Sequence, residues 1–298
     1  MTNQSRHSDE ELIEELKNRF EFNRNALQNL SSLTRKLEEV NQKLQDSEAL
    51  KSHFLSNIRN EINNPLTSIM GLSGQLMSGM ADPQKAAETA GMVYSEAFSL
   101  DFQLRNIFMA AELEAGETSP AFAQVDICKL VEGAIELFSH QATSKEVTLD
   151  AVMEPGTVFA TDAQKLQIIL NNLLANAIEF SPEDSRVEIR VGQDGDSLQL
   201  AVKDFGCGIA KEKQAVVFDR FRQLDTGSTK THPGHGLGLS ITSTLTELLG
   251  GSIELQSDPG QGATFTLTIP QADLAGGIDT IAQDGNFFLF EEEEEETF

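Results

Sequence analysis

Apolar residues recur with heptad spacing from about Asp9 to Leu50, in a stretch that contains no Gly or Pro. The core positions of this repeat are Ile13, Phe20, Leu27, Thr34 and Asn41 at a, and Leu16, Asn23, Leu30, Leu37 and Leu44 at d. Seven of these ten positions are apolar, which favours a coiled coil over a lone amphipathic helix. Because a polar residue such as Asn41 at an a position fixes register and orientation, the pattern predicts a parallel dimer. A solvated helix that packs on its own domain is the alternative.

The helical pattern continues through residues 54–76, so we expect Pro65 to kink this helix rather than end it. A turn signal follows at Met80–Pro83. A second helix is predicted from about Gln84 to Ala115, with Gly116 as its C-cap. Two such hairpins, one from each chain, would form a four-helix bundle.

From about Val125 the pattern changes to short strands that alternate with helices. The sequence predicts a helix over Lys165–Phe180 and strands over Val187–Val191, Leu198–Val202, Ile253–Leu255 and Thr264–Ile269. The pattern fails beyond Pro270, and the chain ends with six consecutive carboxylates, Glu291–Glu296. Such a charge run predicts a disordered, solvated tail.

Composition limits the partners. The chain of 298 residues carries 47 acidic and 22 basic residues, a net charge of −25, which argues against binding of nucleic acid or anionic lipid by a basic patch. Its two cysteines, Cys128 and Cys207, have no metal-ligand spacing and are expected to be reduced thiols. No apolar run approaches the roughly 18 residues of a membrane span, and the first ten residues have no apolar signal core. We therefore expect a cytoplasmic protein without direct membrane insertion.

A series of ordered motifs marks the second half of the chain, which lacks a GxxxxGK[ST] phosphate loop. Each is weak alone, but their order and spacing are specific. The motifs are Asn172–Ala177 (NLLANA), Asp204–Ile209 (DFGCGI), Phe218–Phe221 (FDRF), Gly234–Leu239 (GHGLGL), Gly250–Ile253 (GGSI) and Ser257–Phe265 (SDPGQGATF).

Together with Phe54–Leu66 (FLSNIRNEINNPL), these motifs resemble two-component sensor histidine kinases over roughly residues 50–270. The ATP-binding domain of that family also occurs in gyrase-type topoisomerases, mismatch-repair ATPases and a heat-shock chaperone family, but these do not explain the helical hairpin. The resemblance implies an α+β chain with a parallel coiled coil, a helical-hairpin four-helix bundle and an α/β-sandwich ATP-binding domain. The expected divisions are 1–50 (coiled-coil signalling helix), 51–118 (dimerisation hairpin), 119–271 (ATP-binding domain) and 272–298 (acidic tail).

The resemblance assigns ATP and Mg²⁺ as ligands. Asn172 and Asn176 are four residues apart on one helix, so both amides would lie on one face, and Asn176 matches the magnesium ligand. Asp204 would accept the adenine 6-amino hydrogen, and Arg220 matches the arginine that steadies the phosphoryl group. Residues 222–233 would form a nucleotide lid. The implied nucleotide contacts are Asn172, Asn176, Asp204, Gly206, Gly208, Phe218, Lys230, Gly234, Gly236, Leu237, Gly238 and Thr264.

Two positions depart from the family. The phosphoacceptor histidine is replaced by Asn60, whose amide nitrogen lacks the free lone pair of an imidazole and should not accept a phosphoryl group. Glu179 stands where the family often has a phosphate-contacting lysine, and a carboxylate there would weaken ATP binding. His53, two helical turns before Asn60, is a weak alternative acceptor.

Three functions follow from this pattern. The first is an ATP-binding pseudokinase that acts in signal transduction as a homodimer, as a heterodimer with a competent kinase, or on a response-regulator receiver domain. The second is a phosphatase of the phosphorylated receiver, because Glu61 and Asn64 resemble the family motif E/D-x-x-[T/N], in which the amide orients a water. The third is an active histidine kinase by family descent.

Overall fold

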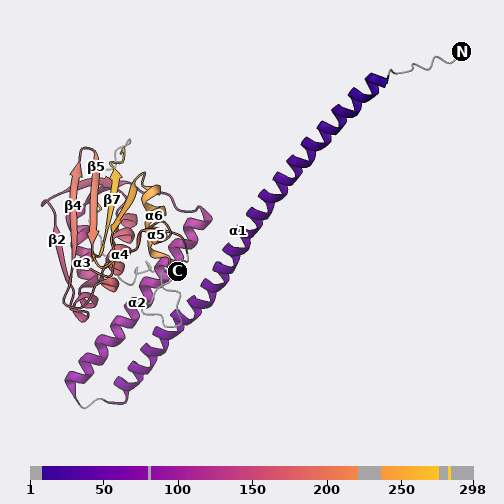
Figure 1. The fold of residues 1–298 in the computed structure, drawn as a ribbon. Coiled ribbons are helices and arrows are strands. Elements are labelled where there is room, and N and C mark those ends of the chain that lie inside the picture. The colour runs from indigo at the N-terminus through magenta and orange to yellow at the C-terminus, as the bar shows by residue number, and fades with distance from the viewer. Residues whose placement is uncertain (1–8, 80–81, 221–235, 275–280, 283–298) are drawn as a thin grey trace, which may run out of the picture. The chain divides into compact units, whose positions relative to one another are not determined.

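The computed structural model describes residues 9–79, 82–220, 236–274 and 281–282 (Figure 1). The chain divides into two compact units, Met1–Ser56 and Asn57–Phe298. Two long helices come first, followed by strands and helices that alternate from β1 onward. This order agrees with the change of pattern that the sequence predicts near Val125.

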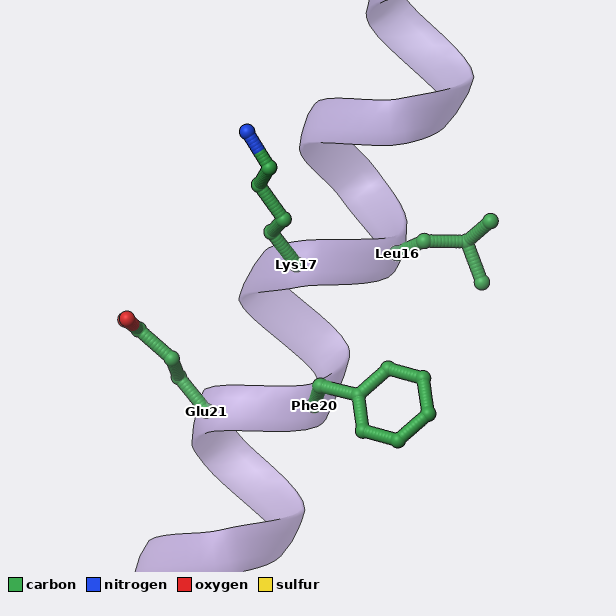
Figure 2. A pocket seen from close by; sticks show the side chains of 4 residues that line it. All are labelled: Leu16, Lys17, Phe20 and Glu21. Atoms are coloured by element: carbon green, nitrogen blue, oxygen red, sulfur yellow. The ribbon is translucent and has the colours of Figure 1, made fainter.

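Helix α1 spans Asp9–Met77 and contains Pro65 in its interior. In the first unit, the large apolar side chains that the structure describes are exposed to solvent: Leu16 is 55% exposed and Phe20 is 76% exposed. These two side chains project from the same side of the helix, whereas Lys17 and Glu21 project from another (Figure 2). The predicted apolar stripe therefore exists as a surface of α1, while the coiled coil itself stays a prediction.

Helix α2 spans Pro83–Ala115, in agreement with the predicted second helix. Asp82 caps its N-terminus by accepting a hydrogen bond from the Gln84 backbone N–H at 3.0 Å. Pro83 follows at a position where its missing N–H has no helical partner to lose. Gly116 ends the helix in the left-handed conformation with φ of 69°, as the sequence predicts.

A five-stranded sheet forms the core of the second half. It has the order β2-β4-β5-β7-β6, and β2 and β4 are its one parallel pair, since β4–β5, β5–β7 and β6–β7 are antiparallel. Alternate residues along the central strands are buried, as expected for a sheet with one covered face. The strands are β2 (Thr148–Val152), β4 (Arg186–Asp194), β5 (Ser197–Lys203), β6 (Ser252–Ser257) and β7 (Ala263–Pro270).

Helices cover one face of this sheet (Figure 1): α3 packs on β2, α4 on β4 and β5, and α6 on β6. Their bounds are α3 Ile127–Ser144, α4 Ala163–Phe180 and α6 Gly238–Leu248, with a short α5 over Lys211–Gln214. Fully buried side chains of α4, such as Leu166, Ile169 and Leu173, meet the inward-facing residues of the sheet. This two-layer arrangement is the predicted α/β sandwich.

A smaller sheet has the order β3-β1-β8. β1 (Ala123–Asp126) pairs with β3 (Val158–Thr161) in antiparallel orientation and with β8 (Ile281–Ala282) in parallel orientation. β8 lies within the tail for which the sequence predicts disorder. The sequence did not predict this strand, because two residues are too few to produce a periodic pattern. The six carboxylates Glu291–Glu296 lie outside the described residues. Over the ranges that the structure describes, no helix is both long enough and apolar enough to cross a bilayer.

Candidate nucleotide site

Helix α4 places the two amides of the NLLANA motif. Its N-terminus is capped by Asp162, whose Oδ1 accepts from the Lys165 backbone N–H at 3.0 Å. One turn of helix separates Asn172 from Asn176, but their environments differ. Asn172 is 1% exposed, whereas Asn176 is partly exposed. Asn176 is therefore the amide that is accessible to a magnesium ion.

The buried Asn172 of α4 packs against the start of α6, where the glycine-rich motif ends. A Cβ atom added to Gly238 would lie 3.3 Å from Asn172 Oδ1. The same oxygen accepts a hydrogen bond from Asn106 Nδ2 of α2 at 2.8 Å. Gly236 and Leu237 precede the helix, and Leu237 is only 2% exposed, so it anchors this end of the motif in the core. Lys230 and Gly234 lie outside the described residues, as does the predicted lid.

Asp204 follows β5 and is 6% exposed. Its Oδ1 accepts from the backbone N–H of Gly206 at 2.9 Å and from that of Ala263 at 3.2 Å. Burial raises the pKa of Asp204 above its ordinary value of 3.8, against the opposing effect of the backbone donors Gly206 and Ala263. Its Oδ2 has no hydrogen-bond partner among the described residues, so it is available to a donor such as an exocyclic amine.

Gly206 and Gly208 are held where no other residue fits. A Cβ atom on Gly206 would lie 2.1 Å from the carbonyl oxygen of Phe180. Gly208 has φ of 66°, and its Cβ atom would lie 2.0 Å from the carbonyl oxygen of Asp258. The backbone of the DFGCG loop is thus packed directly against two neighbouring segments.

Two polar residues that the motif analysis did not single out brace this loop. Ser257 Oγ accepts from the Ile209 N–H at 2.8 Å and donates to the Gly262 carbonyl at 2.6 Å. Gln214 Nε2 of α5 donates to the carbonyls of Ile209 at 2.9 Å and Ser257 at 2.7 Å. Ser257 lies within a quoted motif, but only its side-chain contacts reveal the brace, and they join residues 48 apart in sequence.

Cations gather beside the same loop. The Arg186 guanidinium and the Lys203 ammonium each lie 4.6 Å from the centroid of the Phe205 ring, a distance at which the cation is attracted to the ring. Glu188 on β4 pairs with Arg186 at 2.9 Å and with Arg190 at 2.8 Å. The hydrogen bond from Arg186 is the largest influence that lowers the pKa of Glu188 below its ordinary value.

The departure at Glu179 has a neighbouring cation. Lys145, which follows α3, donates from Nζ to the backbone carbonyls of Ile178, at 2.9 Å, and of Glu179. A cation at this position is stabilised by the negative, C-terminal end of the α4 helix dipole. The sequence did not indicate this contact, since Lys145 lies in no motif.

The remaining predicted residues are spread over several elements. Phe218 packs edge-on against Phe265 with ring centroids 6.3 Å apart, and Thr264 lies on β7 between Lys203 and Gln256. Arg220 is exposed beyond α5.

On the hairpin, Asn60, Glu61 and Asn64 all belong to α1. Asn64 is exposed, while the side chains of Asn60 and Glu61 lie outside the described residues. The structure therefore brings together the α4 and α6 motifs, and separately the Asp204 loop with the β6–β7 turn. Within its described ranges, no hydrogen bond joins Asn64 or Arg220 to either group.

Comparison with known proteins identifies this domain. Residues 161–273 match the family model described as histidine kinase-, DNA gyrase B-, and HSP90-like ATPase. The chain is also 32% identical over 262 residues to the circadian input-output histidine kinase CikA of Synechococcus elongatus. The chain contains the ATPase domain of a two-component sensor histidine kinase. The CikA alignment covers 84% of this chain and 35% of that protein, so the chain spans about a third of the length of this histidine kinase.

Two further similarities agree with the histidine kinase assignment. The sensor-like histidine kinase SenX3 of Mycolicibacterium smegmatis is 30% identical over 224 residues, which cover 75% of this chain and 58% of SenX3. Among solved structures, full-length ShkA in complex with AMPPNP aligns with a TM-score of 0.52 at 27% identity, over 74% of this chain and 46% of that one.

Proposed function

We propose that this chain is a cytoplasmic histidine kinase transmitter that binds ATP but does not phosphorylate itself at the usual position. The proposal is supported by Asn60, a residue of α1 that stands where the resemblance to the family motif places the phosphoacceptor histidine. Phosphoryl transfer requires a nucleophilic lone pair, which a neutral imidazole has. The amide nitrogen of Asn60 is conjugated with its carbonyl and lacks one.

ATP binding is supported by the chemistry of the site. Asp204 Oδ2 would accept the adenine 6-amino hydrogen, and the N-terminus of α6 after Gly236 presents backbone N–H groups of the kind that bind phosphate. Asn176 is the residue that would hold Mg²⁺, since an amide oxygen is a suitable hard ligand. The bound ion would neutralise charge between the phosphates. The similar protein ShkA binds AMPPNP.

The test is incubation with ATP labelled in the γ-phosphate, together with Mg²⁺. The parent chain is expected to remain unlabelled. Asn60→His is expected to acquire acid-labile label. The companion variant Asn60→His, Glu179→Lys also removes the carboxylate that would weaken ATP binding, so it should be labelled at least as strongly. Acid-labile label on the parent would overturn the proposal in favour of an active kinase, and loss of that label in His53→Gln would identify the acceptor.

A chain that binds ATP without accepting phosphate would act through conformation. Its exposed α1 stripe suits a homodimer or a heterodimer with a competent kinase, and the hairpin suits a response-regulator receiver domain. Co-expression with a catalytically competent kinase, followed by a phosphotransfer assay on receivers, tests this regulatory role.

A second candidate function is dephosphorylation of a receiver domain. It is favoured by the exposed side chain of Asn64, which lies one helical turn beyond Asn60 on α1. An amide at this position would orient a water toward the aspartyl phosphate, while Glu61 precedes it in the E-x-x-N motif. Asn64→Ala is expected to abolish release of phosphate from a phosphorylated receiver. Asn63→Ala, at the adjacent exposed asparagine, is the matched control and should keep full activity. Equal activity of both variants would exclude this site.

A further inference from the structure

One face of α2 is turned toward the ATPase domain. Tyr94, Phe98, Phe102 and Asn106 are spaced four residues apart, so their side chains form a single row along the helix. Tyr94 contacts His140, both phenylalanines contact Phe138, and Asn106 contacts Asn172. We call these four residues the α2 row.

The aromatic part of the α2 row closes over Phe138 of α3. The Phe98 ring meets Phe138 edge-on at a centroid distance of 5.5 Å, and Phe102 does so at 5.8 Å. Phe98 and Phe102 are themselves stacked at 6.5 Å. Tyr94 contacts the ring of His140 at 5.8 Å. As a result Phe138 is 0% exposed, and release of α2 would expose it to water.

The polar end of the α2 row reaches the nucleotide site. Asn106 Nδ2 donates to Asn172 Oδ1 at 2.8 Å, and this oxygen lies against Gly238 at the start of α6. Asn172 is 1% exposed, and its Nδ2 has no hydrogen-bond partner among the described residues. A buried donor without a partner is unfavourable, so this amide is incompletely satisfied while α2 is docked.

We propose that α2 and the nucleotide compete for Asn172. The inference rests on the proposed ATP binding and goes beyond it: docking of the α2 row occupies Asn172 Oδ1 with Asn106 and keeps this amide buried, so a nucleotide could use it only after that contact breaks. Nucleotide binding then releases α2, because each ligand of Asn172 weakens the other. By the same linkage, a partner that pulls α2 away from Phe138 would increase nucleotide affinity.

The decisive variant is Asn106→Ala, which removes the hydrogen bond to Asn172 and leaves the aromatic contacts. Since a net hydrogen bond corresponds to about a fivefold change in an equilibrium constant, Mg²⁺–AMPPNP affinity is expected to rise about 3- to 10-fold. Arg105→Ala is the matched control, because Arg105 is exposed on the adjacent position of α2 and pairs with Asp101 of the same helix. Its affinity should equal that of the parent. Affinity is measured by isothermal titration calorimetry.

A second measurement reports on α2 directly. Hydrogen–deuterium exchange of the peptide that contains residues 94–106 is expected to increase when Mg²⁺–AMPPNP is added to the parent. It should also increase without nucleotide in Asn106→Ala and in the double variant Phe98→Leu, Phe102→Leu, but not in Arg105→Ala. The leucine side chains remove the edge-on ring contacts with Phe138 but stay apolar, so the variant weakens docking of α2 without placing a polar group against the core.

The outcomes separate the two proposals. Tighter nucleotide binding in Asn106→Ala with faster exchange in α2 supports the competition. Equal affinity in the parent, Asn106→Ala and Arg105→Ala overturns the competition and leaves ATP binding intact. Absence of nucleotide binding in every protein, shown with folded samples, contradicts the proposed ATP binding, and the competition then falls with it.

Discussion

The Lys165 ammonium lies 2.8 Å from Asp162 Oδ2, and the two side chains are only 9% and 2% exposed. Asp162 Oδ2 also accepts from the Ala121 backbone N–H at 2.7 Å, while its Oδ1 caps α4. One buried carboxylate thus joins an ion pair, a helix cap and the segment that leads from α2 to β1. Such a group is well satisfied only when every partner is present.

We expect Lys165→Met to lower the free energy of unfolding by about 3–5 kcal/mol, because it leaves the Asp162 charge buried without its ion-pair partner. The double variant Asp162→Asn, Lys165→Met should recover part of this loss, since asparagine still caps a helix and no charge is stranded, although its Nδ2 cannot accept from the Ala121 N–H. Urea denaturation monitored by circular dichroism measures both values.

The exposed ion pair between Arg105 and Asp101, whose side chains are 42% and 44% exposed, provides the control. Arg105→Ala is expected to change the free energy of unfolding by about 0.5 kcal/mol or less. A similar loss in Arg105→Ala and Lys165→Met would show that burial is not the cause.

A second prediction concerns Asp204→Asn. The variant should lose about 10- to 100-fold in affinity for adenine nucleotides, because its Nδ2 donor would replace the acceptor that the adenine 6-amino group needs. Isothermal titration calorimetry with Mg²⁺–AMPPNP measures this loss. Unchanged affinity would remove Asp204 from the adenine site.

The same variant has a predicted pH dependence. Burial raises the pKa of Asp204 above 3.8, so its contribution to stability is complete below that pH and is lost as pH rises through the folded-state pKa. Asp204→Asn cannot ionise. The free energy of unfolding of the variant relative to the parent should therefore increase between about pH 4 and neutral pH. A difference that stays constant with pH would contradict this assignment.

A third prediction concerns the DFGCG loop. Gly206→Ala should lower stability by about 1–3 kcal/mol or more, because the new Cβ atom meets the backbone of Phe180 rather than a flexible side chain. Gly133, inside α3, has no atom within 4 Å of its added Cβ. Gly133→Ala should therefore stabilise the chain by about 0.5–1 kcal/mol. Thermal unfolding of the pair compares them, and equal signs would refute the steric explanation.

A fourth prediction tests the coiled coil. Leu30 and Leu37, both d positions, are 60% and 63% exposed. Changing both to Asp should convert a dimer to a monomer, because the charges would be buried in the seam. Phe22 is 73% exposed but lies at a c position, so Phe22→Asp should leave the dimer unchanged. Analytical ultracentrifugation distinguishes these results, and a parent that is monomeric would exclude the coiled coil.

Local signals were sufficient for most elements of the fold. Alternating apolar residues predict β5 and β7, and the combination of Pro83 and Gly116 predicts both ends of α2, because such patterns depend on near neighbours. The resemblance of the glycine-rich motifs assigns Asp204 an adenine contact, and this role stays a prediction. The dimeric state and the roles of Asn60 and Asn64 stay predictions, since they concern partners and chemistry rather than local conformation.

Contacts between distant polar residues left no such signal. Asn106 and Asn172 are 66 residues apart, and neither the spacing nor the type of Asn106 distinguishes it from a surface asparagine. Phe98 and Phe102 read as ordinary apolar positions of the hairpin, although they cover Phe138 of another element. Asn172 was expected to face the ligand with Asn176, and only the packing of α2 reveals its hydrogen bond with Asn106.

The ring of Phe205 has an electrostatic consequence for a protein whose net charge is −25. It holds Arg186 and Lys203 next to the residue that follows Asp204, the proposed adenine acceptor, and one carboxylate, Glu188, is shared between Arg186 and Arg190. The net charge should repel a polyanion such as ATP, whereas this local group of three cations and one carboxylate should attract it. The approach of ATP should therefore be guided to one edge of the sheet, and raising the ionic strength should weaken that guidance.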